Sequence, residues 1–192
     1  AEQECLPQDG VVFKFDDVQY GKSLGNTSHH FRNGIAFKVK NDSVETTLKN
    51  IEYTIGKTGV LTPTAVFESV EIEGTTVERA TLHNISIMKE LLGNPWIGQK
   101  IGVFKANLIV PAIRWGEIDN HTTKRQYIPI PTHCPICHQP TTIKKDNDSE
   151  VLICTNEYCE GKLLKRLSHA VSKNALNIEN LSEASLKRFI QL

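Results

Sequence analysis

The segment CPICHQPTTIKKDNDSEVLICTNEYC, residues 134–159, contains four of the five cysteines of the chain. Two residues separate Cys134 from Cys137, four separate Cys154 from Cys159, and sixteen lie between the two pairs. Two short loops that each supply two thiolates, joined by a spacer of hairpin length, are typical of tetrahedral zinc sites with Zn–S distances of about 2.3 Å. The segment therefore predicts a four-cysteine zinc finger.

The spacer between the cysteine pairs predicts a hairpin. Residues 141–145 and 151–153 are β-type runs, and the polar residues 146–149 between them favour a turn. A pair of disulfides is the alternative, which the Cys-Pro-x-Cys spacing and a cytosolic setting disfavour. His133 and His138 flank the first pair and could substitute for a thiolate, but four thiolates already close the shell. We therefore expect a metal that holds structure and performs no chemistry.

Upstream of the finger, residues 48–116 alternate short β-type runs with Gly and Thr. A helical stretch near 85–92 falls between the third and fourth runs, which is the order of an oligonucleotide-binding (OB) barrel. The predicted fold class is mainly β with α: a five-stranded OB-fold barrel, a small zinc finger and a C-terminal helical segment. The predicted barrel strands are 51–55, 65–72, 75–82, 100–105 and 108–113.

Both ends of the chain add smaller elements. Residues 10–15 and 35–40 predict two strands of one sheet, the first of them buried, and each run carries a lysine among apolar neighbours. The segment Pro129-Ile-Pro131 indicates a stiff linker into the finger. After the last cysteine, leucines at helical spacing predict one helix that ends near Asn174 and a second that begins at about Ser182.

The composition is that of a globular protein and excludes several classes. Of 192 residues, 39% are hydrophobic and 23% charged, which excludes collagen-like and wholly disordered chains. The 22 Lys and Arg residues balance the 22 Asp and Glu residues, so a nucleic-acid partner has to be argued from local charge. The sequence has no apolar run of about 18 residues and no basic, apolar leader, which predicts a cytoplasmic protein without a membrane partner. Because the chain starts without Met beside a predicted strand, we expect a fragment of a longer protein.

Four motifs follow one another in an order that points to one enzyme family. They are Asp9-Gly-Val-Val-Phe-Lys14, Ile35-Ala-Phe-Lys38, Gly56-Lys-Thr-Gly-Val-Leu-Thr-Pro-Thr-Ala-Val66 and Arg79-Ala-Thr-Leu-His-Asn84, and the four-cysteine finger comes next. The first two resemble the last nucleotidyltransferase motifs of bacterial NAD-dependent DNA ligases, and the next two resemble the barrel signatures of that family. The resemblance implies four domains: 1–45, the C-terminal remnant of the nucleotidyltransferase (adenylation) domain; 46–125, the OB-fold; 126–161, the zinc finger; and 162–192, the start of a helix-hairpin-helix domain.

The resemblance also implies a reaction. Such ligases transfer adenylate from NAD to a lysine of the enzyme, then to the 5′-phosphate of a nick in duplex DNA, and finally seal the nick. The implied cofactors are NAD, a structural Zn²⁺, and Mg²⁺ or Mn²⁺ for catalysis in the complete enzyme. The implied partner is nicked double-stranded DNA, bound by a cytoplasmic monomer that acts in DNA replication and in the repair of DNA damage.

Particular residues are assigned through the matched motifs. Lys14 and Lys38 match the catalytic lysines that contact the nucleotide, where fixed cations stabilise a phosphoryl centre that gains charge. The nucleophilic lysine of the family lies in a Lys-x-Asp-Gly motif, which this sequence does not contain, so we expect no self-adenylation by the isolated chain. Cations and short polar donors suit contacts with the DNA backbone. The DNA-contact candidates are Lys57, Arg79, His83, Asn84 and Lys105, with Lys165 and Arg166 as weaker ones.

The chain also departs from the family pattern. Phe104-Lys-Ala-Asn-Leu-Ile-Val-Pro111 lacks one basic residue and one glycine of the usual motif, and Glu160-Gly-Lys162 stands where Pro-Ala-Gln commonly follows the last cysteine. A divergent ligase with an altered grip on DNA is therefore an open interpretation. A catalytically silent, zinc-containing nucleic-acid-binding module is the alternative, and a zinc-stabilised interaction domain without a nucleic-acid role is a third. The two lysine-bearing strands near the start favour the ligase.

Overall fold

The computed structural model describes residues 10–28, 30–38, 42–107, 109–119, 124–146 and 149–190. The chain divides into two compact units, Ala1–Asp42 together with Asn107–Ile109, and Ser43–Ala106 together with Val110–Leu192. Asp9, which begins the first motif, lies outside the described residues. The predicted division into four domains stays a prediction.

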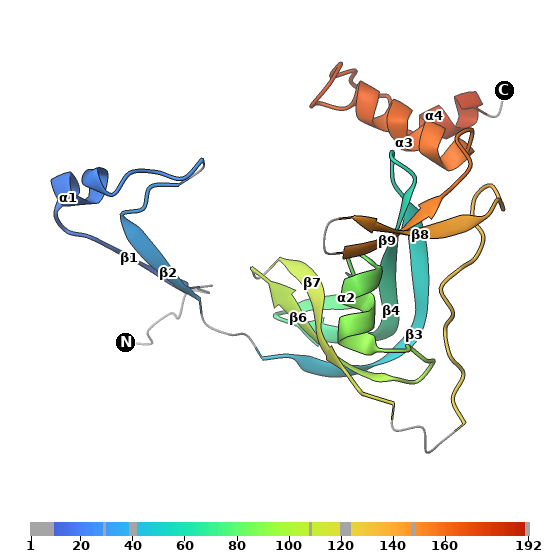
Figure 1. Ribbon diagram of the computed structural model, residues 1–192, viewed down its shortest axis with the longest axis horizontal. Coiled ribbons are helices and arrows are strands. Elements are labelled where there is room, and N and C mark those ends of the chain that lie inside the picture. The colour runs from blue at the N-terminus through green and yellow to red at the C-terminus, as the bar shows by residue number, and fades with distance from the viewer. Residues whose placement is uncertain are drawn as a thin grey trace. The chain divides into compact units, whose positions relative to one another are not determined.

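The smaller unit is a hairpin with one short helix. Strands β1 (Gly10–Lys14) and β2 (Gly34–Lys38) pair antiparallel, and α1 (Val18–Ser23) lies in the connection between them (Figure 1). Asp17 caps α1, because its carboxylate accepts hydrogen bonds from the backbone N–H groups of Gln19 at 2.8 Å and Tyr20 at 3.1 Å. The pairing of the two predicted strands is thus present.

The first strand is not buried as the sequence indicated. Val12 is 60% exposed and Phe13 is 59% exposed, so both faces of the ribbon meet solvent within this unit. A two-stranded ribbon cannot cover its own apolar side chains, because burial of a sheet face requires a second layer. The apolar run reflects strand propensity, and the layer that would bury it is absent from the described residues.

The larger unit contains a closed five-stranded barrel. Its strands are β3 (Val44–Ile55), β4 (Val60–Ile72), β5 (Thr75–Thr81), β6 (Lys100–Ala106) and β7 (Val110–Gly116). Strand β3 pairs with both β4 and β6, β4 with β5, and β6 with β7, all antiparallel, and a parallel bridge between Thr81 and Ala112 joins β5 to β7. The predicted OB-fold barrel is therefore confirmed.

Alternation of apolar side chains along these strands fills the barrel. Phe67, Leu48 and Ile101 are buried from three different strands, and helix α2 (Ile85–Leu92) packs Ile85, Met88 and Leu92 against the same core. Asn84 caps this helix by accepting a hydrogen bond from the N–H of Ile87 at 2.9 Å. The helix connects β5 to β6, as the sequence predicted (Figure 1).

The barrel sheet continues into the finger. Strands β8 (Thr141–Asp146) and β9 (Ser149–Cys154) form the predicted hairpin. Strand β9 pairs with the first residues of β4, Val60 opposite Ile153 and Leu61 opposite Leu152. Leu152 is 2% exposed and belongs to the barrel core. Barrel and finger therefore share one hydrogen-bonded sheet.

Two helices complete the larger unit beside the finger. They are α3 (Glu160–Val171) and α4 (Glu183–Ile190), and the Nζ of Lys165 bridges them through an ion pair with Glu183 at 2.7 Å (Figure 1). Helix α3 approaches β3 closely at Gly161, where an added Cβ would lie 2.7 Å from Ile55. No helix in the described ranges is long and apolar enough to cross a membrane.

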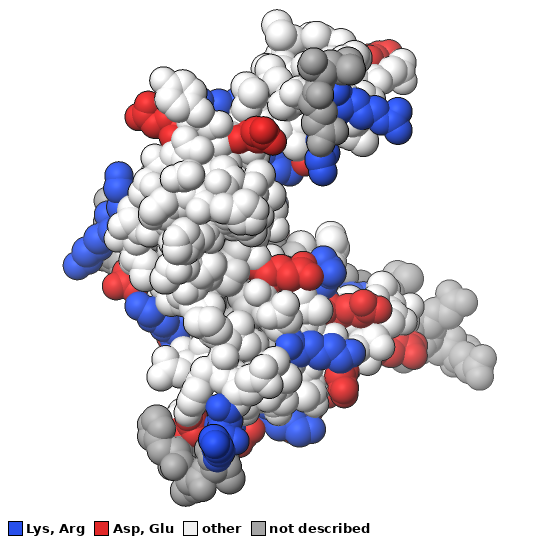
Figure 2. Space-filling model, turned by 90° about the vertical axis from the view of Figure 1, so that its right-hand side faces the viewer, with Lys and Arg blue, Asp and Glu red and all other residues white. Residues whose placement is uncertain are grey.

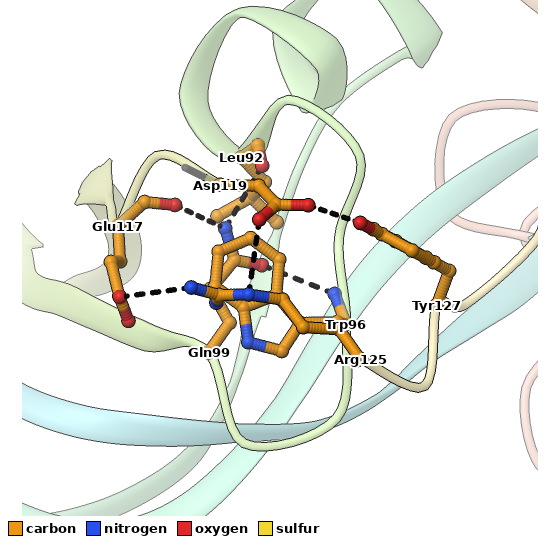
Figure 3. A network of polar contacts seen from close by, with 7 residues as sticks. All are labelled: Leu92, Trp96, Gln99, Glu117, Asp119, Arg125 and Tyr127. Atoms are coloured by element: carbon orange, nitrogen blue, oxygen red, sulfur yellow. Dashed lines mark hydrogen bonds and ion pairs between the residues drawn. The ribbon is translucent and has the colours of Figure 1, made fainter. Parts of the chain in front are cut away.

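A network of polar contacts joins residues 124–128, which follow β7, to the barrel. The guanidinium of Arg125 lies 3.8 Å from the ring centre of Trp96, and its nitrogens lie 3.1 Å from Asp119 and 3.4 Å from Glu117 (Figure 3). The contact with Asp119 is an ion pair without hydrogen-bond alignment. Tyr127 donates a short hydrogen bond to the same carboxylate, which raises the pKa of the phenol. The network holds residues 124–128 against the barrel without a regular strand.

Candidate functional site

The four cysteines of residues 134–159 meet in one cluster. Their sulfur atoms all lie within 4.8 Å of one another. The Sγ atoms of Cys134 and Cys159 are 4.0 Å apart, and those of Cys137 and Cys154 are 3.6 Å apart. These separations exceed a disulfide bond of about 2.05 Å. They bracket the value of about 3.8 Å that a tetrahedron with Zn–S bonds of about 2.3 Å requires. The donor set therefore fits a tetrahedral thiolate-bound metal.

The environment of the thiols explains why this cluster favours a cation. Burial, together with the neighbouring thiols Cys137 and Cys134, raises the pKa of Cys154 to about 12. Burial also raises the pKa of Cys159. Burial opposes ionisation of Cys137 as well, but hydrogen bonds from Gln139 and other neighbours lower its pKa to about 6. Four thiolates repel one another in a buried site, so a divalent cation is needed to ionise all of them.

Local backbone structure positions each pair of thiols. In the first loop, the N–H of His138 donates to the carbonyl of Cys134 at 3.0 Å, and the N–H of Cys134 donates to the carbonyl of Gln139 at 2.9 Å. Cys154 ends β9, and Cys159 is the N-cap residue of α3. Among the described residues, neither His133 nor His138 belongs to the cluster. The histidine alternative therefore finds no support.

A tight barrel turn lies against the cluster. The turn Gly56–Gly59 closes with a hydrogen bond from the N–H of Gly59 to the carbonyl of Gly56 at 3.0 Å. The N–H of Cys154 donates to the carbonyl of Gly59 at 3.0 Å, and the guanidinium of Arg166 donates to the carbonyl of Lys57 at 3.2 Å. Turn, finger and helix α3 meet at a polar cleft of about 620 Å³ that Lys144, Lys162 and Arg166 line with Thr58 and Glu157.

The DNA-contact candidates of the β3–β4 turn and β5 lie far apart along the sheet. Lys57 is exposed in the turn. Arg79 pairs in register with Val66, six residues along β4 from Val60 and therefore about 20 Å from the turn end of that strand. The guanidinium of Arg79 is held by the carboxylate of Glu52 through contacts of 2.9 and 3.3 Å. A phosphate that binds the same two N–H groups of Arg79 has to displace this partner.

Three further candidates have local structural roles or are buried. Asn84 uses its side chain to cap α2, and His83 is an exposed residue with a positive φ of 58° just before that cap. Lys105 is 7% exposed on β6, so it is not the exposed cation that a phosphate contact requires. Burial arises because Lys105 occupies an inward position of a barrel strand. The role of each as a DNA contact stays a prediction.

The two nucleotide-contact candidates occupy opposite ends of the small hairpin. Lys14 pairs with Gly34, whereas Lys38 pairs with Gly10, which separates their backbones by about 13 Å along the ribbon. Lys14 is exposed and lines a cavity of about 290 Å³ together with Arg32, Phe13 and Ile35. The side chain of Lys38 lies outside the described residues.

Surface charge gives no single basic field on the face drawn in Figure 2. Lys and Arg side chains are interspersed there with Asp and Glu around a broad uncharged area. This agrees with the formal net charge of +0. Any nucleic-acid contact on this face therefore depends on individual cations and polar groups rather than on a continuous basic stripe.

Comparison with known proteins gives the family of the barrel. Residues 45–125 match the model of the NAD-dependent DNA ligase OB-fold domain. This match covers the barrel, which is less than half of the chain. The resemblance to bacterial NAD-dependent DNA ligases is confirmed, because proteins named DNA ligase match most of the chain.

Three relatives illustrate the match. A protein named DNA ligase from Lachnoclostridium phytofermentans is 49% identical over 186 residues, which are 96% of this chain and 27% of that protein. One from Ruminiclostridium cellulolyticum is 46% identical over 190 residues, 98% of this chain and 28% of that protein. One from Bacillus cereus is 37% identical over 183 residues, 95% of this chain and 27% of that protein. The chain spans about a quarter of the length of the curated relatives it matches.

Sequence reasoning missed two features of the site. Lys162 follows the last cysteine by three residues, yet it is buried and donates to the carbonyl of Cys154 at 2.8 Å. Arg125 reaches Trp96 across 29 positions of the chain, which no local pattern indicates. The change from Gln to Lys in the family pattern was the available signal for Lys162, but its burial required the packing of α3 against the turn.

Proposed function

We propose that this chain is the DNA-binding segment of a bacterial NAD-dependent DNA ligase that seals nicks in duplex DNA. The match of residues 45–125 to the OB-fold domain of these ligases carries the proposal. The complete enzyme would transfer adenylate from NAD to its own lysine, then to the 5′-phosphate of the nick, and would then join the strands. A cytoplasmic monomer that acts in replication and repair is part of the same proposal.

The metal of the finger is proposed to be Zn²⁺ in a structural role. A buried, four-coordinate thiolate set leaves no position for a substrate or water, so the ion would hold Cys134, Cys137, Cys154 and Cys159 together and take no part in catalysis. The free energy of zinc binding would then appear as folding free energy of the finger. Mg²⁺ or Mn²⁺ would serve catalysis in the complete enzyme.

Contacts with DNA are proposed to use the phosphate backbone. Nick sealing needs no base sequence, and Lys or Arg contacts to phosphates position a protein on duplex DNA without reading bases. Lys57 is the best placed candidate, because its side chain is exposed while the backbone of its turn is hydrogen-bonded to Cys154 of the finger and to Arg166 of α3. Arg79 is a second candidate that Glu52 holds in the absence of DNA. His83 and Asn84 are weaker candidates, and Lys105 is the weakest because of its burial.

Contacts with the nucleotide are proposed for the small hairpin. Lys14 and Arg32 place two cations at one cavity whose walls include Phe13 and Ile35, which suits an aromatic base with a phosphate. Lys38 would act from the far end of the ribbon. Because no Lys-x-Asp-Gly motif is present, the isolated chain should not form a covalent AMP adduct with labelled NAD. Detection of such an adduct would contradict this part of the proposal.

A binding experiment tests the DNA role. Fluorescence anisotropy should show binding to a nicked duplex that weakens steeply between about 50 and 200 mM salt. Lys57→Ala should weaken binding and reduce the salt slope by about 0.9. Lys89→Ala is the matched control, because Lys89 is already paired with Glu150 at 2.6 Å and lies on α2. No binding of the zinc-loaded chain to nicked or intact duplex would count against a DNA-binding segment.

A further inference from the structure

A buried ammonium group lies beside the thiol cluster. Lys162 is 6% exposed, and its Nζ donates a hydrogen bond to the backbone carbonyl of Cys154 at 2.8 Å. Lys165, one turn along the same helix, is instead paired with the carboxylate of Glu183. Among the described residues, no carboxylate lies within ion-pair distance of Lys162. A buried charge without a counter-charge is costly, and one carbonyl dipole does not compensate for it.

The missing counter-charge is available from the cluster. One divalent cation and four thiolates carry +2 and −4, which leaves an excess of two negative charges at the site. This negative charge lies close to Lys162, because the ammonium group of Lys162 donates to the backbone carbonyl of Cys154 and Lys162 follows Cys159 by three residues. The ammonium and the loaded cluster therefore each reduce the cost of burying the other.

The stem of Lys162 also covers the barrel turn. Gly59 has a φ of +91°, and a Cβ built on it would lie 2.2 Å from Cε and 2.8 Å from Nζ of Lys162. The carbonyl of Gly59 accepts the N–H of Cys154 at 3.0 Å. The lysine thus contacts the turn with its methylenes and the backbone carbonyl of the ligand residue Cys154 with its ammonium group.

We propose that Lys162 is a positioning residue that acts as the counter-charge of the metal-loaded thiolate cluster and couples occupation of that cluster to the turn Gly56–Gly59. The turn carries Lys57, so loading of the metal would fix the position of this exposed cation. The coupling rests on the metal half of the proposed function and is independent of whether DNA is the partner.

Zinc affinity tests the counter-charge. The chain is loaded with zinc and titrated with a chromophoric chelator, and Lys162→Met and Lys162→Gln are compared with the native protein. Both variants should release zinc at about tenfold lower chelator concentration, as loss of an outer partner of a metal site typically produces. Lys165→Met is the control, because it removes the same charge from the same helix at an exposed ion pair, and it should leave zinc affinity unchanged.

The two substitutions separate charge from hydrogen bonding. Gln keeps a donor for the carbonyl of Cys154 but loses the charge, whereas Met loses both. Native affinity in Lys162→Gln would show that the hydrogen bond and not the charge matters, and would overturn the counter-charge. Circular dichroism of the zinc-saturated variants shows whether each is folded, so that a folding defect is not read as weak binding.

Hydrogen exchange tests the coupling. Removal of zinc should increase amide exchange in residues 56–59 of the native protein but not of Lys162→Met, because only the native turn loses a contact with an ordered Lys162. Residues 60 and 61 pair with β9 and would respond to the finger alone. Exchange that increases only in residues 134–159 would overturn the coupling. A native chain that holds no zinc would instead contradict the proposed metal, so failure of the metal and failure of the coupling give different results.

Discussion

Substitution of Glu52 by Gln tests whether Arg79 belongs to the DNA-binding face. In the free protein the two contacts of 2.9 and 3.3 Å hold the guanidinium on Glu52, and the side chains are 61% and 45% exposed. An exposed pair of this kind is worth about 0.2–1 kcal/mol, and a phosphate that binds the same two N–H groups of Arg79 has to break it. The substitution removes that cost, so the dissociation constant for nicked duplex should fall by a factor of about 1.4–5.

The matched control changes the same charge elsewhere on the barrel. Glu45 pairs with Lys100 at 3.4 Å, with side chains 58% and 53% exposed, and neither residue is a DNA-contact candidate. Glu45→Gln therefore reports the effect of one lost negative charge on long-range attraction alone. Anisotropy titrations between about 50 and 200 mM salt should show tighter binding in Glu52→Gln than in Glu45→Gln, with an unchanged salt slope because the number of phosphate contacts stays the same. Equal affinities of the two variants would refute the assignment of Arg79 as a phosphate contact.

Three other expectations concern the metal and the barrel. At pH 7.4, zinc binding should release a proton from Cys154, whose pKa is about 12, and little proton from Cys137, whose pKa is about 6. Below pH 6 both thiols are protonated in the zinc-free protein, so the affinity for zinc should fall more steeply with decreasing pH. Calorimetry in buffers of different ionisation enthalpy measures the number of protons released. Arg125→Ala should lower the free energy of unfolding by about 3–5 kcal/mol in urea titrations, because it removes the guanidinium that pairs with the buried carboxylate of Asp119. A loss below about 1 kcal/mol would contradict this. Gly59→Ala should lower the free energy of unfolding by at least about 1 kcal/mol in the same assay. A Cβ is unfavourable at a φ of +91° and would clash with the side chain of Lys162.

The barrel could be predicted from the sequence because its strands alternate apolar and polar residues. The order of strands and the helix 85–92 follow from that pattern and are confirmed. Strand β3 begins at Val44, seven residues before the predicted start at residue 51. The missed part contains polar residues around the core residue Leu48, and Thr46 is buried there with its hydroxyl donating to the carbonyl of Glu68 at 2.7 Å. Burial of this kind depends on a partner 22 positions away and leaves no periodic signal.

The cysteine spacing predicted the thiol cluster, because two short loops on a hairpin leave few other arrangements. The DNA-contact residues were harder to predict. A lysine in a strand reads the same whether it points outward or inward, and Lys105 proves to be buried. The sequence identified Arg79 as a positively charged candidate, but it did not predict the pairing with Glu52, which depends on the register of β3, β4 and β5. Charge and motif identify candidates, whereas exposure and pairing are set by tertiary packing.

The pairing of β9 with β4 makes the finger a cover for the barrel. Without β9, the carbonyl of Gly59 would lose its hydrogen bond from the N–H of Cys154, and the edge of β4 beside Leu61 would be open. The core beside this edge would also lose the cover of Leu152. Open edges next to apolar side chains recruit strands from other molecules. A chain shortened to the barrel alone should therefore self-associate, and loss of the metal should favour aggregation even where the barrel itself remains folded. The metal centre would then protect solubility as well as shape.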